Sequence, residues 1–341
     1  RDDGVIVYLN GAYWGIHNLR EKQKEDYLAA HHGIDPDEGN VARGVTTALD
    51  AGSSGAHTFG AFRRYVLERS KTRLYALLNI SAMGMLSPKI GELEDLRWAD
   101  VEEAVEVGRA NSDYVLGIKA RLSTNIAGNR DVDALKRAIE AAEALDGFVM
   151  IHVGGTSTPL EKLVDMLRPG DVVTHSFHGR SEGVLDNSGR VREGIREAQE
   201  RGIVLDIGHG GGSFSFDTAE KALSQGLFPG NISSDLHIYN LHGPVYDLLT
   251  CVSKFLLLGL SLDDAIEKVT TAPARAMGML GEIGTLQEGA LADVAILEHN
   301  TGTFTFTDSK KKTRTGEQKL DPVSTIRAGR LYAPSAFDFD P

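Results

Sequence analysis

Short apolar runs alternate along the chain with longer stretches in which charged and apolar residues recur at helical spacing. Runs of this kind, separated by amphipathic helices, are typical of strand–helix–strand units and a parallel sheet. The predicted helices include residues 132–145 and 191–201. The candidate strands are residues 4–9, 45–50, 73–80, 114–120, 147–153, 171–177, 202–208 and 231–237. Eight strands with crossover helices predict an α/β fold, a (β/α)8 TIM barrel.

The pattern changes after a helical stretch at residues 262–278. Residues 289–308 and 323–333 alternate in steps of two, which is typical of half-buried antiparallel strands. We therefore expect three parts: an atypical N-terminal segment (1–38) that supplies the first barrel strand, a barrel (39–280) and a small accessory β-domain (281–341). Three consecutive lysines at 310–312 are expected at a solvated hairpin tip.

Charge and cysteine content restrict the partners. The net charge of −12 argues against a nucleic-acid or anionic-membrane surface, since both need a basic footprint. No apolar run approaches the roughly 20 residues that span a bilayer. The one cysteine, Cys251, lies in an apolar helical stretch and is expected to be a buried hydrophobic side chain. These features favour a cytoplasmic protein acting on a small molecule, and homo-oligomerisation stays open.

Polar residues at strand ends are the candidates for chemistry, because a barrel builds its site at the carboxyl ends of its strands. Those that end predicted strands are Lys119, His152, His175 and Asp235. Imidazole and carboxylate bind zinc or another divalent metal, and a lysine joins them only once carboxylated. Such a site suits hydrolysis of an amide or ester, with Asp235 moving a proton. His178 and His209 follow strand ends as candidate substrate-binding groups.

Several motifs carry a family resemblance over roughly residues 35–300. They include "VLGIKARLS", "VMIHVGG", "DVVTHSFHGR", "DIGHGGGSFSF", "ISSDLH" and "TAPARAMGM". Together they resemble the deacetylase, dihydroorotase-like branch of the amidohydrolase superfamily. The resemblance implies a metal held by carboxylated Lys119, His152, His175 and Asp235, with Asp235 as general acid/base and Arg121 contacting substrate. It implies small N-acyl or O-acyl substrates, such as acetylated amino or hydroxy acids.

The front of the chain departs from that family, whose first strand carries a His-x-His pair. Placing residues 4–11 on that strand puts Leu9 and Gly11 at the two histidine positions, and neither can bind a metal. We therefore expect one metal ion rather than two. His17, His31 and His32 are the local histidines, and surface positions are favoured for them.

Residues 1–38 instead resemble a segment of spore-coat CotH-type kinases. The motif is "LNGAYWGIHNLREK", and "GIDPDE" at 33–38 is the expected junction. The segment is too short to hold a kinase site, and the chain has no GxxxxGK phosphate loop.

Three hypotheses follow. The first is a metal-dependent hydrolase, a deacetylase-like enzyme whose activity is reduced by the missing pair. The second is a catalytically impaired barrel that serves as a binding or structural protein, because losing ligands weakens metal affinity. The third places a new surface or activity in the N-terminal segment.

Overall fold

The computed structural model describes residues 5–9, 12–14, 40–85, 91–237 and 239–334, the first two ranges as backbone only. The predictions for Gly11, His17, His31 and His32, and most of the kinase-like segment, fall outside these residues.

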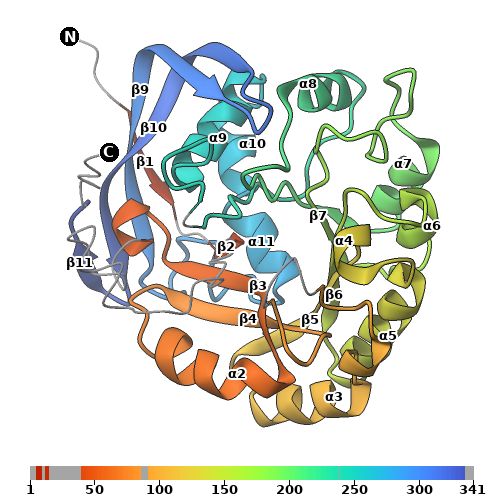
Figure 1. Cartoon of the computed structure of the whole chain (residues 1–341). Helices are drawn as coiled ribbons and strands as arrows, with labels where there is room; N and C mark the ends of the chain where they lie inside the picture. Colours follow the sequence, from red (N-terminus) through yellow and green to blue (C-terminus); the bar gives the residue numbers. More distant parts are fainter. Residues whose placement is uncertain (1–4, 10–11, 15–39, 86–90, 238, 335–341) are drawn as a thin grey trace.

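A seven-stranded parallel sheet forms the larger part of the fold (Figure 1). Its strands follow one another in chain order, and each pairs in parallel with the next. They are β2 (Ala12–Trp14), β3 (Thr47–Gly55), β4 (Arg73–Asn79), β5 (Val115–Arg121), β6 (Phe148–His152), β7 (Val172–Thr174) and β8 (Val204–Leu205). The predicted α/β fold with a parallel sheet is confirmed.

The eighth predicted strand, residues 231–237, is an extended segment joined to the chain beside it by a single bridge between Asp206 and Asn231. Backbone hydrogen bonds continue the pairing, from Ile207 N to Asn231 O and from His209 N to Ser233 O. This pairing carries Asp235 to the same end of the sheet as the ends of β5 to β7.

Helices connect the strands, and their bounds are close to those expected. Among the described residues they are α2 (Ala56–Phe62), α3 (Val101–Ala110), α4 (Thr124–Ala127), α5 (Asp131–Ala144), α6 (Leu160–Val164), α7 (Glu193–Glu200), α8 (Phe216–Ser224), α9 (Leu248–Leu257), α10 (Leu262–Glu267) and α11 (Thr271–Ala276). Short 3-10 turns lie at Val41–Arg43 and Leu96–Trp98, and a π-helical turn at Arg63–Leu67. None of these helices has the length and apolar character needed to cross a bilayer.

The predicted helix at 262–278 is two helices, α10 and α11. Pro273 explains the break, since proline has no backbone N–H and is tolerated only in the first turn of a helix. A new helix therefore begins at Thr271, two residues before the proline.

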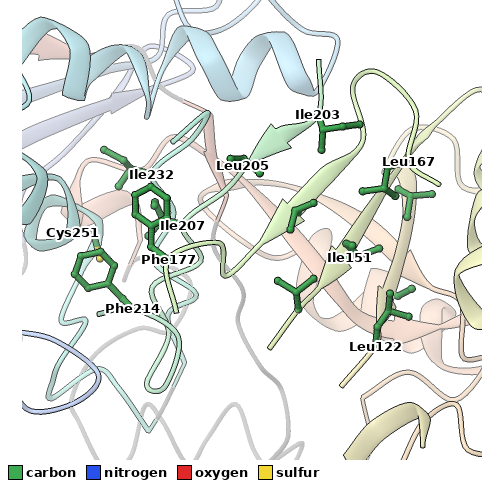
Figure 2. Close-up of a cluster of buried hydrophobic side chains, with 14 of the residues drawn as sticks. Leu122, Ile151, Leu167, Phe177, Ile203, Leu205, Ile207, Phe214, Ile232 and Cys251 are labelled. Atoms are coloured by element: carbon green, nitrogen blue, oxygen red, sulfur yellow. The ribbon is translucent and has the colours of Figure 1, made fainter. Parts of the chain in front are cut away.

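The two faces of the sheet carry different apolar clusters. Within β6, Val149 and Ile151 join the large cluster that the helices cover, whereas Met150 joins a smaller one with Leu77 and Val172. Strand alternation produces this division and places His152 on the same face as Met150. Figure 2 shows part of the large cluster, with Ile151, Leu167 and Ile203 on one side and Phe177, Phe214 and Cys251 on the other.

An irregularity in β5 determines where Lys119 points. Ala76 of β4 opposes Val115 and the next residue, Leu77, opposes Gly117, so Leu116 is an extra residue without a partner in β4. An extra residue in a strand reverses the alternation that follows. Ile118 and Ala120 therefore join the large cluster, and Lys119 and Arg121 lie on the opposite face.

A second, antiparallel sheet has the order β1-β9-β10-β11. It comprises β1 (Val5–Leu9), β9 (Val294–Thr307), β10 (Thr313–Arg327) and β11 (Arg330–Tyr332). The long β9–β10 hairpin runs beside α9 (Figure 1), and Leu320 N donates to Ser253 Oγ of that helix at 3.0 Å. Lys310, Lys311 and Lys312 lie at its tip, as expected.

The placement of residues 4–9 as a barrel strand is wrong. β1 pairs with β9 in the antiparallel sheet, from Val5 opposite His299 to Leu9 opposite Ala295, and β2 takes the place beside β3. A short apolar run suits either sheet, so only its distant partner decides the outcome. Leu9 therefore does not occupy a histidine position of the parallel sheet.

The thiol of Cys251 should be inert until the chain unfolds. Burial raises its pKa to about 12, so only about one thiol in ten thousand is ionised at pH 8. We expect a disulfide reagent to titrate no thiol in the native protein at pH 8 and one per chain in concentrated urea. Rapid labelling of the native protein would contradict this packing of α9.

Candidate functional site

Four predicted residues gather at the carboxyl end of the parallel sheet. Lys119 and His152 come from β5 and β6, His175 follows β7, and Asp235 ends the extended segment beside residues 206–210. The rings of His152 and His175 lie 4.4 Å apart between centroids, at an interplanar angle of 78°. The charge interactions of Lys119 include Asp235 as their largest contribution. The structure thus brings the four together.

Lys119 is the buried centre of the site. Its side chain is 1% exposed, and Nζ has no hydrogen-bond partner among the described residues. Burial lowers the pKa of the amine to about 7, although Asp235 and Asp206 act in the opposite direction. A substantial share of Lys119 is therefore uncharged at neutral pH, which is the form in which an amine reacts as a nucleophile.

Gly52 makes room for this lysine. Its φ is +87°, and a Cβ there would lie 2.4 Å from Cβ of Lys119. Asp50 holds the turn, since its carboxylate accepts hydrogen bonds from the backbone N–H groups of Gly52 (3.1 Å) and Ser53 (2.8 Å). Burial raises the pKa of Asp50 to about 6.

The two histidines are uncharged and oriented. Burial lowers the pKa of His175 to about 3 and that of His152 well below its usual value. Nδ1 of His175 lies 2.6 Å from the carbonyl oxygen of Gly208, so Nδ1 donates and Nε2 keeps its lone pair. A backbone carbonyl on one ring nitrogen is the usual way to orient a metal-binding histidine.

Asp206 is a site residue that our sequence analysis missed. Its Oδ2 accepts from Thr174 Oγ1 at 2.7 Å and from Ser233 Oγ at 2.8 Å, and burial raises its pKa to about 6. Oδ1 has no partner among the described residues. Asp206 and Asp235 both line a small cavity. The signal was present, because Asp206 interrupts the apolar run of the strand at 202–208.

Arg121 lies in a buried ion pair. Its Nη1 donates to Oε1 of Glu92 at 2.5 Å, and Asn79 Nδ2 contacts the other carboxylate oxygen at 3.4 Å. The pair engages one N–H of the guanidinium that we expected to contact substrate, and that contact stays a prediction. Glu92 lies in a loop, and no pattern in the sequence pointed to it.

His209 is also bound within the protein. Nδ1 donates to Gly210 O at 2.9 Å, and Nε2 accepts from Nζ of Lys254 at 2.7 Å. Lys254 is fully buried on α9, and its Nζ also donates to Pro244 O at 2.7 Å. Both ring nitrogens of His209 are thus engaged, and the bridge fixes the loop that carries Gly208.

His178 differs from His209 because one of its ring nitrogens has no hydrogen-bond partner among the described residues. The side chain is 2% exposed, Nδ1 accepts from the backbone N–H of Arg180 at 3.1 Å, and Nε2 has no partner among the described residues. Burial, with help from Arg180 and Lys310, lowers its pKa to about 4.

The donor set fits a metal ion only if Lys119 is included. Within the ranges described, no three His, Cys, Asp or Glu side chains converge as a ready cation site. Two neutral imidazoles and the unpartnered amine of Lys119 nevertheless share one end of the sheet with Asp235. Once carboxylated, Lys119 would supply the oxygen ligand that this group lacks.

Known proteins resemble the chain over most of its length. A family model described as "Amidohydrolase family" matches residues 237–333. A deacetylase of Enterococcus faecalis is 35% identical over 301 residues, which cover 87% of this chain and 80% of that protein. The chain belongs to the amidohydrolase family. A second relative, a deacetylase of Brucella anthropi, is 38% identical over 82% of this chain and 70% of its own.

Solved structures agree with amidohydrolase membership. The crystal structure of an adenine deaminase has a TM-score of 0.88 and 32% identity, covering 98% of this chain and 88% of that one. The crystal structure of a dihydroorotase has a TM-score of 0.85 and 32% identity, covering 97% of this chain and 84% of that one. The amidohydrolase resemblance seen in the sequence is confirmed, and so is a hydrolase function in general terms.

Replacing Gly52 with alanine should disrupt the site. The new Cβ would overlap the Lys119 side chain at a backbone angle that alanine rarely adopts, so we expect a loss of stability of more than about 1 kcal/mol. Gly60→Ala is the control, because Gly60 is exposed in α2 with nothing near its Cβ position and should gain roughly 0.5–1 kcal/mol. Urea unfolding measures both, and equal shifts in the two variants would contradict the packing of Lys119.

Lys254→Met should test the buried bridge to His209. Methionine fills the same space but leaves His209 Nε2 and Pro244 O without a donor, at a cost of about 1–3 kcal/mol for each buried acceptor. Lys136→Met on the exposed side of α5 is the control and should change the free energy of unfolding by less than about 0.5 kcal/mol. Equal effects of the two substitutions would mean that the bridge does not contribute.

Proposed function

We propose that the protein is a metal-dependent hydrolase that removes the acyl group of a small acylated compound by cleaving an amide or ester. The observation that supports this most is the unpartnered amine of Lys119, buried beside two uncharged histidines. The names of the two bacterial relatives, both deacetylases, support the acyl substrate.

Lys119, His152, His175 and Asp235 would hold the metal, which is zinc or another divalent ion. We propose one ion rather than two. The Lys119 amine would first add to carbon dioxide, forming an N–C bond and releasing one proton, and the resulting carbamate would be the ligand. When bound, the metal would lower the pKa of a water molecule and polarise the acyl carbonyl.

The protein's own groups prepare and complete the reaction. Gly208 O fixes the ring of His175, so its Nε2 lone pair is presented in one direction. Asp235 would accept a proton at its carboxylate and return it to the leaving nitrogen or oxygen. A Cβ at Gly210 would lie 2.5 Å from Oδ2 of Asp235, so only glycine lets this loop approach the carboxylate so closely.

We propose further that the parallel sheet closes as a TIM barrel over residues 39–280, with residues 281–341 as the accessory β-domain. Support comes from the seven parallel strands in chain order and from the high structural similarity to the two solved enzymes. The pairing of residues 231–234 beside 207–210 would provide the eighth position.

A catalytically impaired barrel is the less favoured alternative. Burying the Lys119 amine, the His175 imidazole and the Asp206 carboxyl group together is costly unless a ligand satisfies them. The unpartnered atoms of Lys119 and Asp206 support a site that takes a ligand, and the two deacetylase relatives favour catalysis there over binding alone. The hypothesis of a new activity at the front end rests on residues outside those described.

Metal analysis and one substitution test the proposal together. We expect about one tightly bound zinc per chain by mass spectrometry and hydrolysis of N-acetyl or O-acetyl compounds. His152→Ala should remove the metal and lower kcat/KM by at least a hundredfold, because a ligand is lost. His299→Ala, at a half-buried position on β9 of the antiparallel sheet, is the control and should change neither. No metal after supplementation, or full activity in His152→Ala, would overturn the proposal.

A further inference from the structure

We propose that His178, Arg180 and Lys310 form a subsite for a carboxylate group of the substrate. This inference rests on the proposed acyl hydrolysis and specifies its substrate as an acylated carboxylic acid. The three residues come from two distant parts of the chain, the loop after β7 and the tip of the β9–β10 hairpin.

The first observation is the buried, unpaired N–H of His178. Because Nδ1 accepts the Arg180 backbone N–H at 3.1 Å, the ring proton of the neutral imidazole lies on Nε2. Nε2 is buried and has no acceptor among the described residues. Leaving such a donor unsatisfied costs roughly 1–3 kcal/mol, so a bound acceptor is expected.

Arg180 lies beside that donor. Its Nη1 donates to Gly154 O at 3.2 Å, which brings the guanidinium against the loop that follows His152. The Cβ position of Gly154 is 3.5 Å from His178 Nε2 and 3.7 Å from Arg180 Cδ. A Cβ at Gly155 would lie 3.0 Å from Nη1 of Arg180, so the absence of a side chain there leaves room for the guanidinium. The imidazole donor and the guanidinium thus meet at Gly154 and Gly155, two and three residues past His152.

Lys310 is brought to the same place by the hairpin tip. Buried Asp308 accepts the backbone N–H groups of Lys310 at 2.8 Å and of Phe216 at 3.0 Å, which fixes the tip on the loop before α8. Cε of Lys310 then lies 3.1 Å from the Cβ position of Gly179, between His178 and Arg180 in the chain. The charge of Lys310 acts on His178.

Within the described part of the chain, neither cation forms an ion pair, although the whole chain carries a net charge of −12. Among the described residues neither Arg180 nor Lys310 forms an ion pair, whereas nearby Lys312 and Arg314 both pair with Asp217. Two charged groups without an ion-pair partner and one N–H donor suit a small anion. A carboxylate is the matching group, because its two oxygens can accept from the guanidinium fork and from the imidazole together.

The position of the subsite limits the substrate further. The backbone N–H of His178 donates to His175 O at 3.2 Å, so the subsite lies one turn of chain from a proposed metal ligand. Since the His178 ring also interacts electrostatically with His152 and His175, a carboxylate bound there would lie near the acyl bond that is cleaved. An N-acyl amino acid or an O-acyl hydroxy acid has this arrangement.

Matched substrates test the subsite. The probes are N-acetyl amino acids, both enantiomers, and their neutral carboxamides, which have nearly the same shape. We expect the wild-type enzyme to favour the carboxylates at least tenfold in kcat/KM. Arg180→Gln and Lys310→Gln should each raise KM for the carboxylates about tenfold, with kcat changed less than threefold and the carboxamides unaffected. Lys311→Gln, with the same charge change on the same hairpin tip, is the control.

The outcomes separate this inference from the proposed function. Hydrolysis of both probe sets without preference, or an equal loss on both in the variants, would overturn the subsite and leave the hydrolase intact. If neither set is hydrolysed, nor the corresponding O-acetyl hydroxy acids, titration calorimetry with the carboxylates decides the matter. Binding of the carboxylates that is lost in Arg180→Gln would then support the subsite and contradict the proposed hydrolase function. Absence of binding to the wild-type protein would contradict both proposals.

Discussion

The burial of the Lys119 amine constrains everything around it. A long side chain whose amine is buried at the end of a sheet must point inward, must have space, and must have its positive charge offset. The structure meets each of these three requirements. The extra residue Leu116 turns β5 so that Lys119 faces inward. Gly52 leaves out the side chain that would collide with it. The carboxyl groups of Asp50, Asp206 and Asp235 lie near enough to offset part of its charge.

A second layer of interactions then orients the groups that surround this amine. The carbonyl of Gly208 fixes His175, and the Lys254–His209 bridge fixes the loop to which Gly208 belongs. The tip of the β9–β10 hairpin holds the same loop from outside, since Ser309 Oγ donates to Gly210 O at 3.1 Å. The antiparallel sheet is therefore part of the frame of the site, although it contributes no proposed metal ligand.

Much of this could be predicted from sequence, because a local rule applied. His152, His175 and Lys119 each end an apolar strand, and strand ends of one parallel sheet meet at one edge. Asp206 obeys the same rule, since it lies near the end of the apolar run at residues 202–208. Lys254 could not be found this way, because it is a single cation in an apolar helix and its partner lies 45 residues away.

The failure at residues 4–9 has a different physical origin. Nothing within five apolar residues distinguishes a parallel strand from an antiparallel one, and the partner β9 lies almost 300 residues further on. The outcome is that one short stretch contributes β1 to one sheet and β2 to the other. β1 and β2 are therefore end strands of the two sheets, paired with β9 and with β3. One continuous stretch of chain thus ties the antiparallel sheet to the parallel sheet, so the two sheets cannot separate without breaking the strand pairing in one of them.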